Sequence, residues 1–207
     1  MTSVFKRKVD NSIKDSPIRN QDLDEPSDET LIRQFSNGSR ISYELLVTRY
    51  KKRIFEFIYF QIKQHKHDAE DLTQDVFIEL YKKAENFRHE SKFSTYIFSV
   101  AKNIVLNYFR AKYRFFSLST LFNKSEKVEV SNMQEQLIYE ADKQQIVRAL
   151  NILNADERQI IYLCDKEDFS YLQISDILNI KVGTVRSRLN TARKKVIKIS
   201  RENADEL

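Results

Sequence analysis

Glycine and proline are nearly absent from this sequence, with two residues of each among 207. β-Hairpins use glycine at their tight turns, and the phosphate-binding loops of nucleotide enzymes need several glycines close together. Gly38 and Gly183 are far apart, so the sequence excludes such a loop and argues against a fold rich in hairpins. Long helices joined by polar turns remain, and the sequence therefore predicts an all-α protein.

Cysteine, histidine and long apolar runs are also scarce. The single cysteine, Cys164, cannot form an internal disulfide, which suits a reducing cytosol. No apolar run is long enough to span a bilayer and the N-terminus lacks a hydrophobic signal core, so we expect a cytoplasmic protein without membrane insertion. His65 and His67 are close together but the third histidine is distant, which leaves too few ligands for zinc. With no nucleophile triad either, we expect no metal, no cofactor and no catalytic chemistry.

The net charge is only +5, but the charges are unevenly distributed. Seven Asp or Glu residues lie in the segment 68–90, where apolar residues recur at steps of four and predict a helix with one apolar stripe. We expect Asp68 to be the N-cap of this helix. The segment 91–125 contains no acidic residue, and its six Lys or Arg are interleaved with nine Phe or Tyr. An acidic helix followed by a basic, aromatic one predicts one surface for a protein and another for nucleic acid.

The order of periodic and polar segments predicts two helical domains. The expected parts are a disordered leader over 1–26, a first domain over 27–114, a flexible linker over 115–135 and a second domain over 136–201. In the first domain, Ser27 or Asp28 begins a short helix that Gly38 ends. Because each domain has its own apolar stripes, we expect the two to fold independently.

The second domain ends in a helix-turn-helix pattern. A short helix is predicted over 169–178, with a break at Asn179 and a new helix from about Val182. Between Lys181 and Arg201 there are eight Lys or Arg and no acidic residue. A short helix, a tight turn and a basic helix are typical of a motif whose second helix enters the major groove of DNA.

Motifs in both domains resemble the bacterial sigma-70 family. DAEDLTQDVF at 68–77, FSTYI at 93–97 and AKN at 101–103 resemble region 2 of that family. SYLQI at 170–174 and GTVRSRL at 183–189 resemble region 4, which ends in a helix-turn-helix. Two such regions joined by a linker alone resemble the extracytoplasmic-function (ECF) group.

The resemblance implies a transcription initiation factor with no enzymatic activity of its own. Such a factor binds core RNA polymerase, directs it to specific promoters and helps to melt the DNA. Region 4 recognises the −35 element as duplex, and region 2 captures the melted strand of the −10 element. The implied partners are core RNA polymerase, promoter DNA and an anti-sigma factor. Free in solution, the two domains are expected either to tumble separately or to be held by an anti-sigma protein.

Three sets of residues are expected to make these contacts. The polymerase-binding set is Asp71, Gln74, Asp75, Phe77 and Ile78. The set for −10 DNA is Asn86, Phe87, Arg88, His89, Ser91, Lys92, Lys102, Asn103, Asn107 and Arg110. The set for −35 DNA is Lys181, Thr184, Arg186, Ser187, Arg188, Arg193 and Lys194. Asn, Ser and His can donate and accept hydrogen bonds at a base edge, and Arg can pair with guanine. Packing in the core explains Phe93, Phe98 and Tyr108 more easily than it explains the loop at 86–91.

Several residues depart from the family pattern. Tyr96 stands where Trp is usual, Asn107 where Asp is usual and Gln173 where Glu is usual, and Asn154 replaces the first residue of a common Leu-Pro pair. Lys181 opens the last helix. A lysine there caps poorly and its charge opposes the helix dipole, which together destabilise the helix by about 0.5–1 kcal/mol. Because Asn107 and Lys181 lie in the two DNA-binding sets, a second hypothesis stays open. In it, the chain is a degenerate sigma-like adaptor that binds polymerase or a regulator without promoter recognition.

Overall fold

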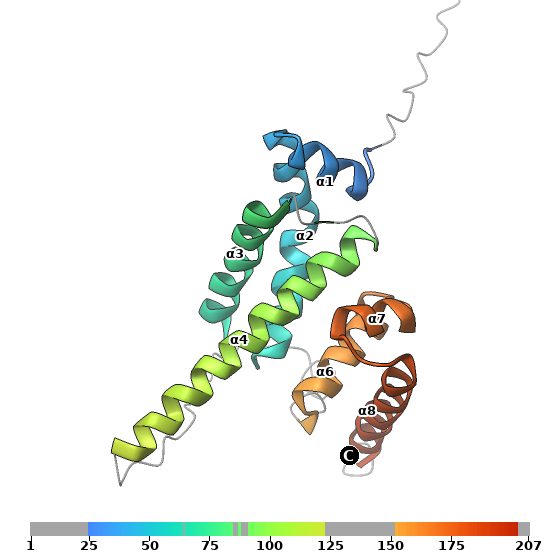
Figure 1. Ribbon diagram of the computed structural model, residues 1–207. Helices are drawn as coiled ribbons and strands as arrows, with labels where there is room; N and C mark the ends of the chain where they lie inside the picture. The colour runs from blue at the N-terminus through green and yellow to red at the C-terminus, as the bar shows by residue number, and fades with distance from the viewer. Residues whose placement is uncertain (1–24, 64, 85–86, 88–90, 123–151, 203–207) are drawn as a thin grey trace, which may run out of the picture.

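The computed structural model describes residues 25–63, 65–84, 87, 91–122 and 152–202, and over these the secondary structure is helical (Figure 1). The elements in chain order are α1 (Asp28–Ser36), α2 (Arg40–Gln61), α3 (Lys66–Lys83), α4 (Phe93–Phe122), α6 (Ala155–Ile161), the π-helical turn η2 (Tyr162–Lys166), α7 (Tyr171–Leu178) and α8 (Val182–Glu202). The predicted all-α fold is confirmed. Most of the expected leader and linker, and residues 136–151 of the expected second domain, lie outside the described residues. Among the helices that are described, none has the length and apolar content needed to cross a bilayer.

Local sequence explains where α1 begins and ends. Ser27 is its N-cap, and the Ser27 side-chain oxygen accepts a hydrogen bond from the amide of Thr30 at 3.2 Å. Just past the other end, Gly38 has a φ of 97°, a conformation that favours glycine, and its amide donates to the carbonyl of Phe35 at 2.8 Å. Both predicted ends of this helix are confirmed.

The first domain is a bundle of α1 to α4. α3 packs against α2 and α4, and α1 lies at one end of the bundle against α2 and α4 (Figure 1). The predicted apolar stripes meet in its core, which includes Leu46, Ile54, Phe57, Val76, Leu80, Ile97 and Ala101. Phe93 and Phe98 are fully buried, as expected, and Tyr108 is half-buried.

The helix α4 is longer than the sequence analysis predicted. It continues from residue 115 to Phe122, through residues that were assigned to the linker. No glycine or proline occurs between Phe93 and Phe122, so no residue that breaks a helix ends it earlier. The fading of the apolar period after residue 114 therefore does not mark the end of the helix.

The predicted cap of α3 is wrong. The helix begins at Lys66 with His65 in the N-cap position, and no side chain caps it. Asp68 lies in the first turn, where its carboxylate accepts a hydrogen bond from the Tyr108 hydroxyl of α4 at 2.5 Å. Burial and this hydrogen bond raise the pKa of Tyr108 above its ordinary value. Asp68 thus joins α3 to α4 instead of capping α3.

The second domain consists of α6, η2, α7 and α8. A capping box begins α6: the Asn154 side chain accepts from the amide of Glu157 at 2.9 Å, and the Glu157 carboxylate accepts from the amide of Asn154 at 3.1 Å. This explains why an asparagine can replace the family's usual residue there. α8 packs against α6 and α7, and Val185 and Leu189 are buried on its inner side.

The two domains pack against each other, an arrangement that the sequence analysis does not predict. α7 lies against α4, and α6 lies against α2. The rings of Phe98 and Phe169 are 5.2 Å apart edge to face, and the Tyr162 ring lies 5.5 Å from that of Phe57. One continuous cluster of buried apolar residues runs through both domains. We call this contact of α2 and α4 with α6, η2 and α7 the interdomain seam.

Polar groups are also buried in the interdomain seam. Gln61 is fully buried, and neither its side-chain nitrogen nor its side-chain oxygen has a hydrogen-bond partner among the described residues. Arg158 is 6% exposed and donates to the Gln61 backbone carbonyl at 3.4 Å, and burial lowers its pKa. A buried polar group without a partner costs about 1–3 kcal/mol, so this contact is weaker than an apolar one of equal area.

Candidate polymerase and nucleic-acid interfaces

Four of the five residues predicted to bind polymerase lie on the exposed side of α3. Asp71, Gln74, Asp75 and Ile78 follow one another at helical spacing and are exposed, and Ile78 is 47% exposed. The other side of α3 faces the core through its apolar stripe. An exposed apolar side chain among acidic groups suits a basic partner surface, because charge guides the encounter and apolar contact adds affinity.

Phe77 is not part of this surface, and the prediction that it adjoins the acidic residues there is wrong. It is 6% exposed. Its backbone carbonyl accepts a hydrogen bond from the Tyr43 hydroxyl of α2 at 3.1 Å. One residue along a helix turns the side chain by about 100°, so Phe77 faces α2 while Ile78 faces solvent.

An aromatic cluster extends the exposed side of α3, and the sequence analysis missed it. Tyr81 follows Ile78 by three residues and is 59% exposed. Its ring lies 5.2 Å from that of Tyr43 and 5.3 Å from that of Phe35. The spacing from Ile78 was the signal that could have found it, because positions three apart share one side of a helix.

The exposed polar side of α4 contains most of the described residues of the −10 set. Six of them are exposed or half-buried: Ser91, Lys92, Lys102, Asn103, Asn107 and Arg110. The Lys102 ammonium donates to the Asn103 side-chain oxygen at 3.2 Å, which orients that amide. Asn86, Arg88 and His89 lie outside the described residues.

Phe87, in contrast, is a core residue. It is 7% exposed, and its ring lies 5.1 Å from that of Tyr96 and 6.0 Å from that of Phe93. The prediction that packing explains Phe87 less easily than DNA binding does is therefore wrong, because its ring is packed among other aromatic residues. Tyr96, which replaces the family's usual Trp, is half-buried in the same cluster.

The helix-turn-helix is confirmed in α7 and α8. Ser170 and Gln173 form a capping box at the start of α7, so glutamine here performs the task of the usual glutamate. Asn179 ends α7 in the left-handed conformation, with a φ of 54°. The Ser175 hydroxyl donates to the carbonyl of Ile180 at 2.5 Å and closes the turn before α8.

The −35 set lies at the solvent side of α8. Its seven members are exposed or half-buried: Lys181, Thr184, Arg186, Ser187, Arg188, Arg193 and Lys194. Two of these cations already have carboxylate partners, because Arg188 pairs with Asp156 at 2.6 Å and Arg193 pairs with Asp165. Arg186 makes no ion pair among the described residues, so its guanidinium can bind a partner without first losing one.

A third ion pair anchors α8 to α6. The Lys195 ammonium lies 2.7 Å from the Glu157 carboxylate, and Glu157 is 5% exposed. Burial opposes ionisation of Glu157, but hydrogen bonds from Lys195 and from the Asn154 amide outweigh it and hold the pKa of Glu157 below its ordinary value. The pair fixes the rotation of α8 and so the direction of its basic side.

Two family models match this chain, Sigma-70 region 2 over residues 46–115 and Sigma-70, region 4 over residues 143–196. The first match covers most of the helical bundle, and the second contains the helix-turn-helix. Together with the fold, they place the protein among the bacterial initiation factors: this chain belongs to the sigma-70 family, in its ECF group.

Curated relatives and solved structures agree with this assignment. The ECF RNA polymerase sigma-E factor of Escherichia coli strain K12 is 28% identical over 178 residues, which cover 82% of this chain and 92% of the relative. The ECF RNA polymerase sigma factor SigE of Mycolicibacterium smegmatis is 29% identical over 157 residues, which cover 75% of this chain and 60% of the relative.

Two solved structures share the fold. The sigma factor RpoE of Bartonella quintana superposes with a TM-score of 0.63 at 24% identity, over 77% of this chain and 96% of RpoE. CnrH superposes with a TM-score of 0.63 at 19% identity, over 86% of this chain and 99% of CnrH.

Proposed function

We propose that this chain directs core RNA polymerase to specific promoters through three separate surfaces. The acidic side of α3 binds the core enzyme, the polar side of α4 binds the melted −10 strand, and α8 recognises the −35 duplex. Promoter recognition takes place in the cytoplasm, where bacterial DNA and polymerase meet, and requires no catalytic group from this chain. The proposed domains are those of the sequence analysis, with the last helix of the first extended to Phe122.

The exposed Arg186 near the start of α8 is the observation that carries this proposal. The second helix of a helix-turn-helix places its N-terminal residues against base edges in the major groove. Arg186 and Ser187 are both exposed there, and an arginine can bond guanine O6 and N7 together. The Lys181 carbonyl accepts from the amide of Thr184 at 2.8 Å, and the Lys181 side chain is exposed at the same helix end. A phosphate there would be attracted by the ammonium and by the helix amides together, which would offset the poor capping.

The polar side of α4 has the groups that a single strand requires. Proteins bind unpaired nucleotides with cations for the phosphates and aromatic faces for the bases. Asn103, Asn107 and Arg110 recur at helical spacing on the exposed side. Tyr113 follows three residues after Arg110 and is 75% exposed, so it can offer a face on which a base stacks.

An anti-sigma protein is a further proposed partner. RpoE was solved in complex with the anti-sigma factor NepR, and CnrH in complex with the cytosolic domain of CnrY. These complexes concern relatives of low identity, so they support the proposal for this chain through the shared fold. Covering α3 or α8 with a second protein would block polymerase binding or promoter recognition.

Run-off transcription tests the proposed function. Purified core RNA polymerase from the same bacterium would be mixed with this chain and with genomic fragments. We expect transcripts from a subset of fragments that share sequences at the −35 and −10 positions. None of the comparisons favours the adaptor hypothesis, but the same experiment tests it: an adaptor would bind the core enzyme and yield no transcript.

A further inference from the structure

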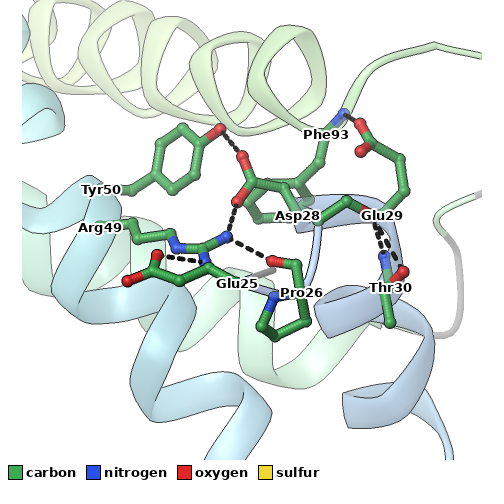
Figure 2. A network of polar contacts seen from close by, with 9 residues as sticks. Glu25, Pro26, Asp28, Glu29, Thr30, Arg49, Tyr50 and Phe93 are labelled. Atoms are coloured by element: carbon green, nitrogen blue, oxygen red, sulfur yellow. Dashed lines mark hydrogen bonds and ion pairs between the residues drawn. The ribbon is translucent and has the colours of Figure 1, made fainter. Parts of the chain in front are cut away.

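The short helix α1 contacts both ends of the connection between α3 and α4, and it precedes the residues that match the region 2 model. At one end, the Glu29 carboxylate accepts a hydrogen bond at 3.0 Å from the amide of Phe93, the first residue of α4 (Figure 2). At the other end, the Ser36 hydroxyl lies 3.2 Å from the carbonyl of Ala84, the residue that follows α3. The same hydroxyl is 3.0 Å from the carbonyl of Ile32, so these two acceptors share its proton.

α1 is itself held firmly by α2. The Arg49 guanidinium donates to the Asp28 carboxylate at 2.7 Å and to the carbonyl of Pro26 at 2.8 Å (Figure 2). The Tyr50 hydroxyl donates to the other oxygen of Asp28. Apolar residues of α1 are fully buried on the side that faces the bundle. Because its first turn is fixed in this way, Glu29 is presented to α4 from a rigid support.

Glu29 does for α4 what an N-cap side chain usually does. The first amides of a helix have no partner within the helix, and a carboxylate is stabilised beside them by the helix dipole. The residue before α4 is Lys92, whose carbonyl accepts the first helical hydrogen bond from Tyr96 but whose side chain cannot accept one. Phe93 is fully buried, with its ring 5.2 Å from that of Tyr50. The start of α4 is therefore fixed in both position and direction from outside its own sequence.

We propose that α1 is a brace that sets the spacing of α3 and α4, with Glu29 and Ser36 as positioning residues for binding of the melted strand. The helix between Glu29 and Ser36 is about 10 Å long, which sets the distance from the end of α3 to the start of α4. α3 carries the polymerase-binding side and α4 the strand-binding side. The brace thus determines where the strand lies relative to the core enzyme, and this inference rests on the proposed function of α4.

The test compares variants of the full chain in complex with core RNA polymerase. The probe is a forked DNA whose non-template −10 strand is unpaired, made from a fragment that is active in run-off transcription. Glu29→Ala removes the acceptor and should weaken binding of this probe by about 5- to 10-fold, as the loss of a helix cap would. Glu29→Gln keeps an acceptor oxygen and should restore most of the affinity. Ser36→Ala should weaken binding in the same direction, while Arg33→Ala, on the exposed side of the same helix, should not.

Two further measurements separate positioning from a general loss of structure. Affinity for the core enzyme and for a −35 duplex should stay within about twofold of wild type, as for surface changes far from those sites. Equal losses in all three assays would overturn the brace, and so would wild-type binding of the forked probe by Glu29→Ala and Ser36→Ala. If Glu29→Ala does not fold, Ser36→Ala decides the question, because wild-type probe binding by this variant would overturn the brace.

Arg110→Ala distinguishes failure of the brace from failure of the proposed function. Arg110 is exposed on α4 and is not part of the brace. If Arg110→Ala weakens binding of the forked probe and Glu29→Ala does not, the brace alone is wrong. If neither variant weakens it, the proposed role of α4 is wrong, and the brace fails with it.

Discussion

Arg53 of α2 and Glu167 of the second domain form an ion pair across the interdomain seam. The Arg53 Nε and Nη2 atoms lie 2.8 and 2.6 Å from one oxygen of Glu167. The Glu167 side chain is 5% exposed and that of Arg53 is 40% exposed. The guanidinium also lies over the rings of Tyr50 and Phe98, 5.0 and 5.5 Å from their centroids. One side chain therefore links the core of the first domain to a buried charge of the second.

Removal of Arg53 should loosen the two domains. Arg53→Ala leaves the Glu167 carboxylate buried without its partner, and we expect the free energy of unfolding to fall by about 1–3 kcal/mol, less than for a fully buried pair because Arg53 is half-exposed. Urea denaturation measures this change, and small-angle X-ray scattering should show a larger radius of gyration. Lys52→Ala is the control, because the Lys52 side chain is 87% exposed. A variant as compact and stable as wild type would contradict the role given to this pair.

The seam also predicts an effect on promoter binding. The centres of the −35 and −10 elements are about 25 base pairs, or roughly 85 Å of B-DNA, apart. The 30 residues of α4 extend only about 45 Å, so two domains packed side by side are too close together to reach both elements. We therefore expect the seam to open during promoter binding, so Arg53→Ala should raise the affinity of the complex with core enzyme for a promoter fragment by up to about tenfold. Titration of a labelled fragment with that complex checks this, and an unchanged or lower affinity would count against it.

Charge reversal on α3 should prevent polymerase binding. Asp71 and Asp75 lie one turn apart and are both exposed, so replacing both with Lys places two cations where a basic partner surface is expected. Co-purification with core enzyme should be lost while the helical content by circular dichroism stays at the wild-type level. Asp176→Lys makes the same charge change per site on an exposed position of α7 and should not affect binding. Retention of core enzyme by the double variant would refute the docking assignment.

Arg186 and Lys194 should differ in what they contribute to duplex binding. Arg186→Ala should weaken binding to a −35 fragment by about 1–3 kcal/mol and relax the preference at one base pair. Lys194→Ala should weaken binding to specific and random duplex alike and reduce the slope of log K against log salt by about 0.9. Fluorescence anisotropy at several salt concentrations measures both. Equal losses on specific and random duplex for Arg186→Ala would reduce Arg186 to a phosphate contact.

The Glu157–Lys195 pair predicts a loss of stability in acid. Because the folded-state pKa of Glu157 is depressed, its contribution is complete above the ordinary glutamate pKa of 4.5 and is lost as the pH falls through the lower folded value. Glu157→Gln should therefore be less stable than wild type near neutral pH, and the difference should shrink as the pH falls below about 4.5. Thermal melts across this range test the prediction. Glu44→Gln, at an exposed position of α2, should leave the pH dependence unchanged.

Much of the fold follows from the sequence because helix ends and apolar stripes are local signals. Ser27, Gly38 and Asn179 each mark a helix end by chemistry that needs no information from distant residues. The same holds for the exposed Asp71 and Arg186, whose helical positions follow from the apolar period of α3 and α8.

Three of the errors concern which surface covers an apolar side chain. A phenylalanine in the core and one that binds a partner look the same in the sequence. Only the positions of α2 and α4 show that Phe77 and Phe87 are both buried. The interdomain seam could not be predicted for the same reason. Phe98 and Tyr162 fit the apolar stripe of their own domain, and nothing local indicates that each faces the other domain. Arg53 differs from its exposed neighbours Lys51 and Lys52 through its contacts with Phe98 and Glu167, and Glu167 is more than a hundred residues away in sequence.

The side-chain amide of Gln61, which has no hydrogen-bond partner within the described part of the chain, has a consequence for hydrogen exchange. When α6 moves away from α2, water can bond that side chain, which offsets part of the free energy of separating the domains. The seam should then open far more often than either domain unfolds. The amides of Glu167 and Phe169 donate to the carbonyls of Tyr162 and Leu163 beside the seam. They should take up deuterium well before the amides in the middle of α2, so a single chain would show two separate levels of protection.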